Sequence, residues 1–100
     1  MSNRIPIDLD RLRALCLKWR VRELSLFGSV LRPDFSPASD VDVLVSFEPG
    51  AAWSLWDMME MKEELEDLFG RSVDLVEREA LRNPWRRNEI LKSLEVIYAT

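Results

Sequence analysis

The stretch that most constrains the fold is DVDVLVSF, residues 40–47. β-Branched apolar residues alternate in it with other side chains, a pattern typical of a β-strand with two different faces. The valines point to one face, whereas Asp40 and Asp42 share the other. Two neighbouring acids on one face repel each other, so the strand requires either solvent or a cation on that side.

Two amphipathic helices are predicted, one before this strand in the sequence and one after it. The first has Asp8 or Asp10 as its N-cap and ends near Arg20, and the second begins at Ser54 and stops at Gly70. Apolar side chains recur every three or four residues along each helix and are expected to face the core. They are Leu12, Leu15, Cys16 and Trp19 in the first, and Leu55, Met58, Met61, Leu65 and Leu68 in the second.

The remaining pattern predicts a mixed sheet in a single domain spanning residues 1–100. The order α, β, short α, β, α, β, α is typical of a small α/β (α+β) fold with three or four strands, helices packed over the sheet and one sheet face left open. Shorter elements complete it: strands at 23–27 and 73–76, a helix at 79–91 that restarts at Asn83-Pro84, and EVIYA at 95–99 as a fourth strand that the pattern leaves open.

Composition excludes several classes of site. The chain has no histidine and one cysteine, which rules out histidine triads, an intrachain disulfide and cysteine-based zinc sites. A metal would need oxygen ligands, which favours Mg²⁺ or Mn²⁺. The net charge of −4 argues against direct nucleic-acid binding. No apolar run is long enough to span a membrane and no signal peptide is visible, so we expect a cytoplasmic protein.

A Gly-Ser pair precedes the acidic strand. Gly28 permits close backbone approach and Ser29 offers a hydroxyl and an N–H, which suits a phosphate group, although the same pair is also ordinary turn chemistry. Ten residues separate Ser29 from Asp40, and a third acid, Asp74, lies in the next predicted strand. Three carboxylates from two adjacent strands, beside a loop able to hold a triphosphate, indicate two-metal phosphoryl-group chemistry; a solvated strand face is the alternative.

The sequences GSVLRPDFSPASDVDVLV and SVDLVEREALRNP resemble the nucleotidyltransferase superfamily that includes DNA polymerase β. Nearly the whole chain is similar to its minimal branch, the MntA-type antitoxins that are paired with HEPN-domain toxins. The resemblance implies that Gly28 and Ser29 contact nucleotide phosphates and that Asp40 and Asp42 bind two Mg²⁺ ions, with Mn²⁺ as a substitute. It implies that Asp74 shares one metal and helps to deprotonate the acceptor.

The same resemblance implies a reaction and a partner. AMP is transferred from ATP with release of pyrophosphate, and in MntA-type members the acceptor is a tyrosine hydroxyl of a HEPN ribonuclease toxin, with which the antitoxin forms a hetero-oligomer. Two alternatives stay open. The chain could neutralise its toxin by binding alone, or it could transfer a nucleotide to a small molecule or an RNA end.

Two further groups of side chains suit either packing or binding. Trp53, Trp56, Met59 and Trp85 could fill the core or form a protein interface. Cationic residues outnumber acidic ones between residues 78 and 92. They indicate either a solvated helix face or contacts to phosphate or to an acidic partner. Arg32, beside the Gly-Ser pair, could also make such contacts. These cationic residues are Arg78, Arg82, Arg86, Arg87 and Lys92.

Overall fold

The computed structural model describes residues 7–28 and 40–100, and these form a mixed sheet with helices on both sides. The four strands lie in the order β3-β2-β1-β4. This arrangement confirms the predicted fold class and adds the fourth strand. The strands are β1 (Val21–Phe27), β2 (Val41–Phe47), β3 (Val73–Glu77) and β4 (Glu95–Ala99); the helices are α1 (Leu9–Lys18), α2 (Leu55–Phe69), the 3₁₀ turn η2 (Arg78–Ala80) and α3 (Pro84–Lys92).

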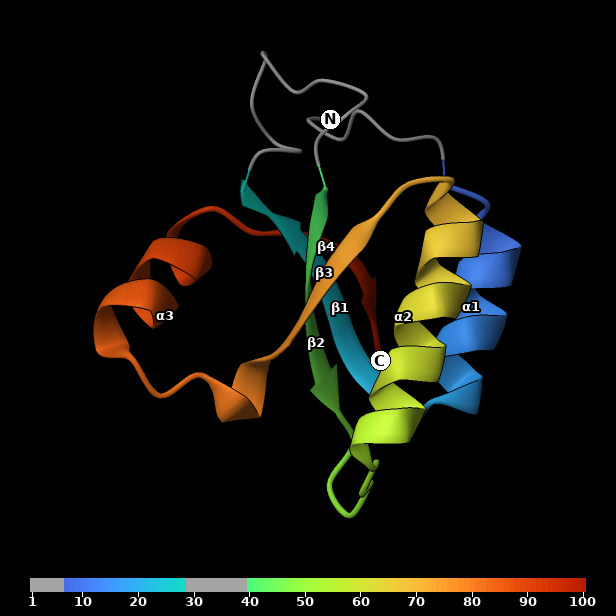
Figure 1. Ribbon diagram of the computed structural model, residues 1–100, viewed down its shortest axis with the longest axis horizontal. Helices are drawn as coiled ribbons and strands as arrows, with labels where there is room; N and C mark the ends of the chain where they lie inside the picture. The colour runs from blue at the N-terminus through green and yellow to red at the C-terminus, as the bar shows by residue number, and fades with distance from the viewer. Residues whose placement is uncertain (1–6, 29–39) are drawn as a thin grey trace.

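The pairing of the strands follows from the connections between them. β1 pairs antiparallel with β2 and with β4, whereas β2 pairs parallel with β3. A parallel pair needs a crossover connection, and α2 provides it. α1 and α2 lie together on one side of the sheet and α3 lies on the other (Figure 1). The sheet face that the sequence pattern left open is therefore covered in part by α3.

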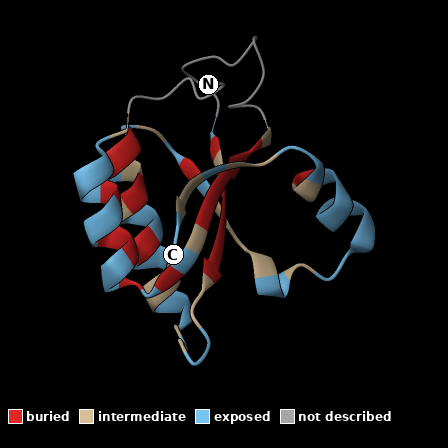
Figure 2. Cartoon of the chain, turned by 180° about the vertical axis from the view of Figure 1, so that it is seen from behind, coloured by how far each residue is buried: buried red, intermediate tan, exposed pale blue. Residues whose placement is uncertain are grey.

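The main core lies between the sheet and the pair α1 and α2. The predicted alternation of β2 is confirmed, because Val41, Val43 and Val45 are fully buried in this core. In Figure 2, residues coloured as buried lie in the sheet and on the inner sides of α1 and α2, while the outer sides of both helices are coloured as exposed. Burial of this much apolar surface is the main favourable term in folding the chain.

Local signals fix the helix ends. Asp8 caps α1 by accepting a hydrogen bond from the Arg11 N–H at 3.2 Å, and Ser54 forms a capping box with Asp57 at the start of α2. α2 ends at Gly70, whose φ of 69° is left-handed. These caps satisfy backbone groups that a helix leaves unpaired at its ends, so the boundaries agree closely with the sequence expectations.

Cys16 is buried in the core, as predicted. Its thiol is fully inaccessible, and burial raises its pKa to about 12. A thiol that stays protonated at neutral pH is a poor nucleophile. Cys16 is therefore a packing residue of α1.

One expectation is wrong. The spacing predicts Leu55 in the core stripe of the second helix, but Leu55 is 75% exposed. The spacing gives only the direction in which a side chain points, and burial depends on what lies opposite.

The predicted interruption of the helix at 79–91 is confirmed. An extended backbone separates η2 from α3, and α3 begins at Pro84 with Asn83 as its N-cap.

The sequence left both packing and binding open for four aromatic and methionine side chains, and one of the four is packed while three are exposed. Trp53 packs edge-on against Trp19 with 5.0 Å between ring centroids, and its indole N–H donates to the Trp19 carbonyl at 2.9 Å. In contrast, Trp56, Met59 and Trp85 are exposed. Only Trp53 of the four thus belongs to the main core.

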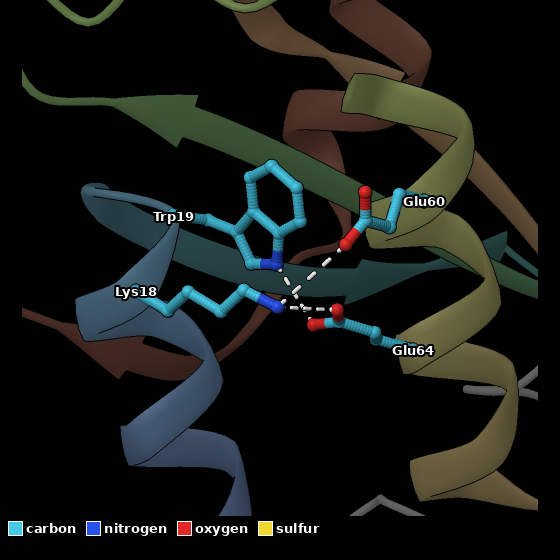
Figure 3. Close-up of polar contacts among 4 residues, drawn as sticks. All are labelled: Lys18, Trp19, Glu60 and Glu64. Atoms are coloured by element: carbon cyan, nitrogen blue, oxygen red, sulfur yellow. Dashed lines mark hydrogen bonds and ion pairs between the residues drawn. The ribbon is translucent and has the colours of Figure 1, made fainter. Parts of the chain in front are cut away.

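A polar cluster joins α1 to α2 beside this core (Figure 3). The Lys18 ammonium lies 2.6 Å from Glu64 and 3.8 Å from Glu60, and the Trp19 indole N–H donates to Glu64 at 2.9 Å. Burial by itself would raise the pKa of Glu64, but the hydrogen bonds from Lys18 and Trp19 outweigh it and lower that pKa. The ionised carboxylate is therefore the form that holds the two helices together.

Replacing Glu64 with glutamine is expected to lower the free energy of unfolding by about 1 kcal/mol at pH 7. A carboxyl group with a lowered folded-state pKa stabilises the protein above its unfolded-state pKa and loses that effect as pH falls through the folded-state value. The difference between Glu64→Gln and the parent should thus shrink as pH falls below the unfolded-state pKa of about 4.3. Urea unfolding at pH 7 and at about pH 3.5 measures this change, with Glu63→Gln as an exposed control. A difference that is as large at the lower pH as at pH 7 would contradict this account.

Candidate active site

The register of β2 and β3 brings two carboxylates side by side. Asp42 on β2 lies opposite Asp74 on β3, and neighbouring strands are about 4.8 Å apart. Asp42 alternates with Val41 and Val43 of the main core, so it and Asp74 face the other side of the sheet, toward α3. Asp42 is half-buried and Asp74 is exposed. Two acids from strands separated by 25 intervening residues, 48–72, therefore meet on one face.

Gly28 lies against the carboxylate of Asp42. The β1 register pairs Phe27 with Asp42, so that Gly28 follows directly beyond the last pair. Gly28 has φ of +74°, and a Cβ at this position would overlap Asp42 Oδ2 and lie 3.2 Å from its Cγ. The sequence pattern predicts that Gly28 lets a ligand come close to the backbone. The structure adds a nearer reason, which is that only a residue without a side chain leaves room for this carboxylate.

The other predicted site residues lie near or beyond the edge of the described structure. Asp40 is exposed and directly precedes β2, whose first N–H, that of Val41, donates to the Ser72 carbonyl at 2.9 Å. Ser29 and Arg32 lie outside the described residues. Within residues 7–28 and 40–100, no three acidic or cysteine side chains group closely enough to hold one ion. The three-carboxylate metal site therefore stays a prediction, while the pairing of Asp42 with Asp74 is observed.

An apolar cluster supports this face of the sheet. Phe27 is paired with Asp42 across β1 and β2, and Leu44 lies two residues after Asp42 on β2. Both pack with Ile90 of α3. Sequence reasoning missed these residues as part of the site, because Ile90 is remote in sequence and its contact depends on how α3 folds back. The phenylalanine directly before Gly28 was the one available signal. The cluster fixes the backbone that carries Asp42.

Farther along the same face is a polar hollow of about 260 Å³. Ser46 lies four residues after Asp42, about 13 Å away along β2. Its hydroxyl donates to Glu79 at 2.6 Å, and the Arg78 guanidinium lies 3.4 Å from the Glu23 carboxylate. These groups pair with one another, whereas at the Asp42 end of the same face the carboxylates of Asp42 and Asp74 lie side by side.

Comparison with known proteins assigns the family. The nucleotidyltransferase domain family matches residues 10–97. This chain belongs to that family. A protein assigned as a protein adenylyltransferase in Methanocaldococcus jannaschii is 32% identical over 77 residues, which cover 77% of each chain. The protein adenylyltransferase MntA of Thermococcus cleftensis is 42% identical over 66 residues, 66% of this chain and 65% of the relative. The predicted resemblance is confirmed, and the chain is an enzyme of the nucleotidyltransferase class.

Solved structures agree with the fold of this nucleotidyltransferase. One described as a minimal nucleotidyltransferase is 35% identical, covers 89% of this chain and 95% of its own, and has a TM-score of 0.66. Two others are 17% identical and show the fold alone. One is a toxin-antitoxin with AMP-PNP, which has a TM-score of 0.73 over 94% of this chain and 75% of its own. The other is a tri-AMPylated Shewanella oneidensis HEPN toxin in complex with MNT antitoxin, which has a TM-score of 0.65 over 92% of this chain and 70% of its own.

The residues present suit the metal that the family chemistry implies. Asp42 and Asp74 offer carboxylate oxygens, the ligand type that Mg²⁺ prefers, from two hydrogen-bonded strands. The space that a Cβ at Gly28 would fill is kept clear for the Asp42 carboxylate. Two like charges in adjacent register repel each other, and a cation between or beside them would relieve this repulsion.

Proposed function

We propose that this enzyme is a Mg²⁺-dependent adenylyltransferase that transfers AMP from ATP to a tyrosine hydroxyl of a HEPN-type ribonuclease toxin and thereby acts as its antitoxin. The observation that carries the proposal is the Asp42–Asp74 register beside Gly28. The 42% identity to a protein adenylyltransferase MntA supports the protein acceptor. The chain would act in the cytoplasm; in the described residues, no helix has the length and apolar character needed to cross a membrane.

Each site residue has a role in this proposal. Gly28 and Ser29 contact the triphosphate, Asp40 and Asp42 hold the metal ions, and Asp74 shares one of them. When bound, Mg²⁺ neutralises phosphate oxygens and makes the acceptor hydroxyl more acidic. The acceptor oxygen forms a bond to the α-phosphorus of ATP, the bond to the bridging oxygen breaks and pyrophosphate leaves. Asp74 takes the hydroxyl proton.

The acceptor must come from another molecule if it is a tyrosine. The chain has one tyrosine, Tyr98, on β4. Tyr98 packs against the main core, which is on the opposite side of the sheet from Asp42 and Asp74. Its ring therefore does not lie on the face where the reaction is proposed, and a partner protein supplies the hydroxyl.

The test is an AMP-transfer assay. The purified chain is incubated with Mg²⁺, ATP and the proposed HEPN-domain partner, and intact-mass spectrometry follows the partner. We expect a mass increase of one or more AMP units on a tyrosine, lost on chelation of Mg²⁺ and restored by Mn²⁺. Replacement of the modified tyrosine by phenylalanine is the matched control on the partner. An unmodified partner under these conditions would reject the proposal.

The exposed tryptophans favour a second candidate function, neutralisation by binding alone. Trp56 and Trp85 are 77% and 81% exposed, and tryptophan is enriched in protein interfaces. Under this alternative, an Asp42→Asn variant would still inhibit the toxin in the absence of ATP. A modified RNA end or small molecule in the same assay would instead indicate a non-protein acceptor.

A further inference from the structure

α3 is a helix with little packing of its own. It has nine residues, and only Ile90 is buried, so that most of its surface is exposed (Figure 2). Trp85 in its first turn is 81% exposed. A helix this short is marginal by itself, and the stability of short helices comes from burying an apolar face. α3 thus presents a large apolar side chain that the part of the chain described by the structure leaves exposed.

The charge of this segment is opposite to that of the chain. Residues 82–92 carry four cationic side chains and one carboxylate, whereas the chain as a whole has a net charge of −4. Lys92 lies 3.7 Å from Glu89. Within residues 7–28 and 40–100, no ion pair involves Arg82, Arg86 or Arg87. Three guanidinium groups are therefore available to carboxylates of another molecule.

The position of α3 connects it to the candidate active site. Its buried residue Ile90 packs with Phe27 and Leu44, the neighbours of Asp42 on the sheet. One side of α3 is thus fixed to the face where nucleotide transfer is proposed. Another side borders a hollow of about 410 Å³ that Trp85, Asn88, Glu89, Leu91 and Lys92 line. α3 itself lies on the same side of the sheet as Asp42 and Asp74 (Figure 1).

α2 carries a second exposed apolar patch, but its charge and place differ. Trp56 and Met59 are exposed there, and the acids Asp57, Glu60 and Glu63 lie among them. This patch is on the opposite side of the sheet from Asp42 (Figure 1). An acidic partner would be repelled at α2 and attracted at α3.

We propose that α3 is the docking surface for the acceptor protein, which offers an apolar pocket for Trp85 and a rim of carboxylates for Arg82, Arg86 and Arg87. The inference rests on the proposed function, because it places the acceptor beside the transfer site. A buried aromatic anchor surrounded by charge pairs is the usual form of an interface hot spot. A protein partner is favoured over RNA because the acidic remainder of the chain repels a polyanion.

The test compares three variants with the wild-type chain in binding to the proposed HEPN-domain partner. Trp85→Ala and the double change Arg86→Glu with Arg87→Glu should each weaken binding by about 10-fold or more, measured as a Kd without ATP. In AMP transfer they should raise KM for the partner and leave kcat nearly unchanged. Trp56→Ala removes an equally exposed tryptophan from α2 and should bind as the wild type does. Higher salt should weaken wild-type binding more than binding by the charge-reversed variant.

The outcomes separate this inference from the proposed function. Wild-type affinity for Trp85→Ala, or an equal loss for Trp56→Ala, would overturn the assignment of α3. Binding of RNA by the wild type that the arginine changes abolish would also overturn it, because the surface would then recognise phosphates. Tight binding without any AMP transfer would instead reject the proposed function and leave the docking surface in place.

Discussion

Asp42→Asn should lower the rate of AMP transfer by about 10³-fold or more. The change removes one charge from the carboxylate pair on β2 and β3 and leaves an amide of almost the same shape. Metal ions contribute several kcal/mol of transition-state stabilisation in such reactions, and each 1.36 kcal/mol corresponds to a factor of ten in rate. Single-turnover AMP transfer to the HEPN partner, followed by intact mass, measures the loss.

Stability provides the control for Asp42→Asn. Because asparagine has almost the same shape as aspartate, the variant should stay folded, and its melting temperature is compared with that of the wild type. Asp67→Asn is the matched variant, since Asp67 is exposed on α2 at the other side of the sheet, and it should transfer AMP normally. If the Asp42→Asn enzyme were fully active, Asp42 would not be a ligand of the proposed metal site. A variant that loses activity only because it unfolds would be recognised by its melting temperature.

Gly28→Ala should lower AMP transfer by about 100-fold while the chain stays folded. The new Cβ would overlap Asp42 Oδ2, and the end of a side chain moves more readily than backbone, so the carboxylate turns away from its position. A displacement of this kind at a reacting centre is expected to cost about 10²-fold in rate. The left-handed backbone of Gly28 adds a stability cost of about 1 kcal/mol.

Gly70→Ala separates the two effects of that change. Gly70 at the end of α2 has φ of +69°, close to the +74° of Gly28, but a Cβ there would meet nothing within 4 Å. Both variants should therefore lose similar stability in urea unfolding, and only Gly28→Ala should lose activity. Equal activity losses in the two variants would show that destabilisation, and not the position of Asp42, limits the reaction.

Local patterns predicted most of the elements because the forces that define them act over a few residues. The alternation in residues 40–47 gave the buried valine face of β2, and Ser54 and Gly70 marked the ends of α2 within one residue. The spacing of apolar residues did not predict the exposure of Leu55. Periodicity fixes a direction around a helix axis, whereas burial needs a partner element from elsewhere in the chain.

The candidate site shows the same division. The residues alone indicated a Gly-Ser pair, an Asp-x-Asp strand and a later acid, and these residue types favoured an oxygen-ligated metal and a phosphate. The folded chain adds that β2 and β3 pair in parallel with Asp42 opposite Asp74, that Gly28 lies against the Asp42 carboxylate, and that α3 covers part of this face through Ile90. The reason is physical, because strand register and helix placement minimise the free energy of the whole packed chain, to which distant segments contribute together.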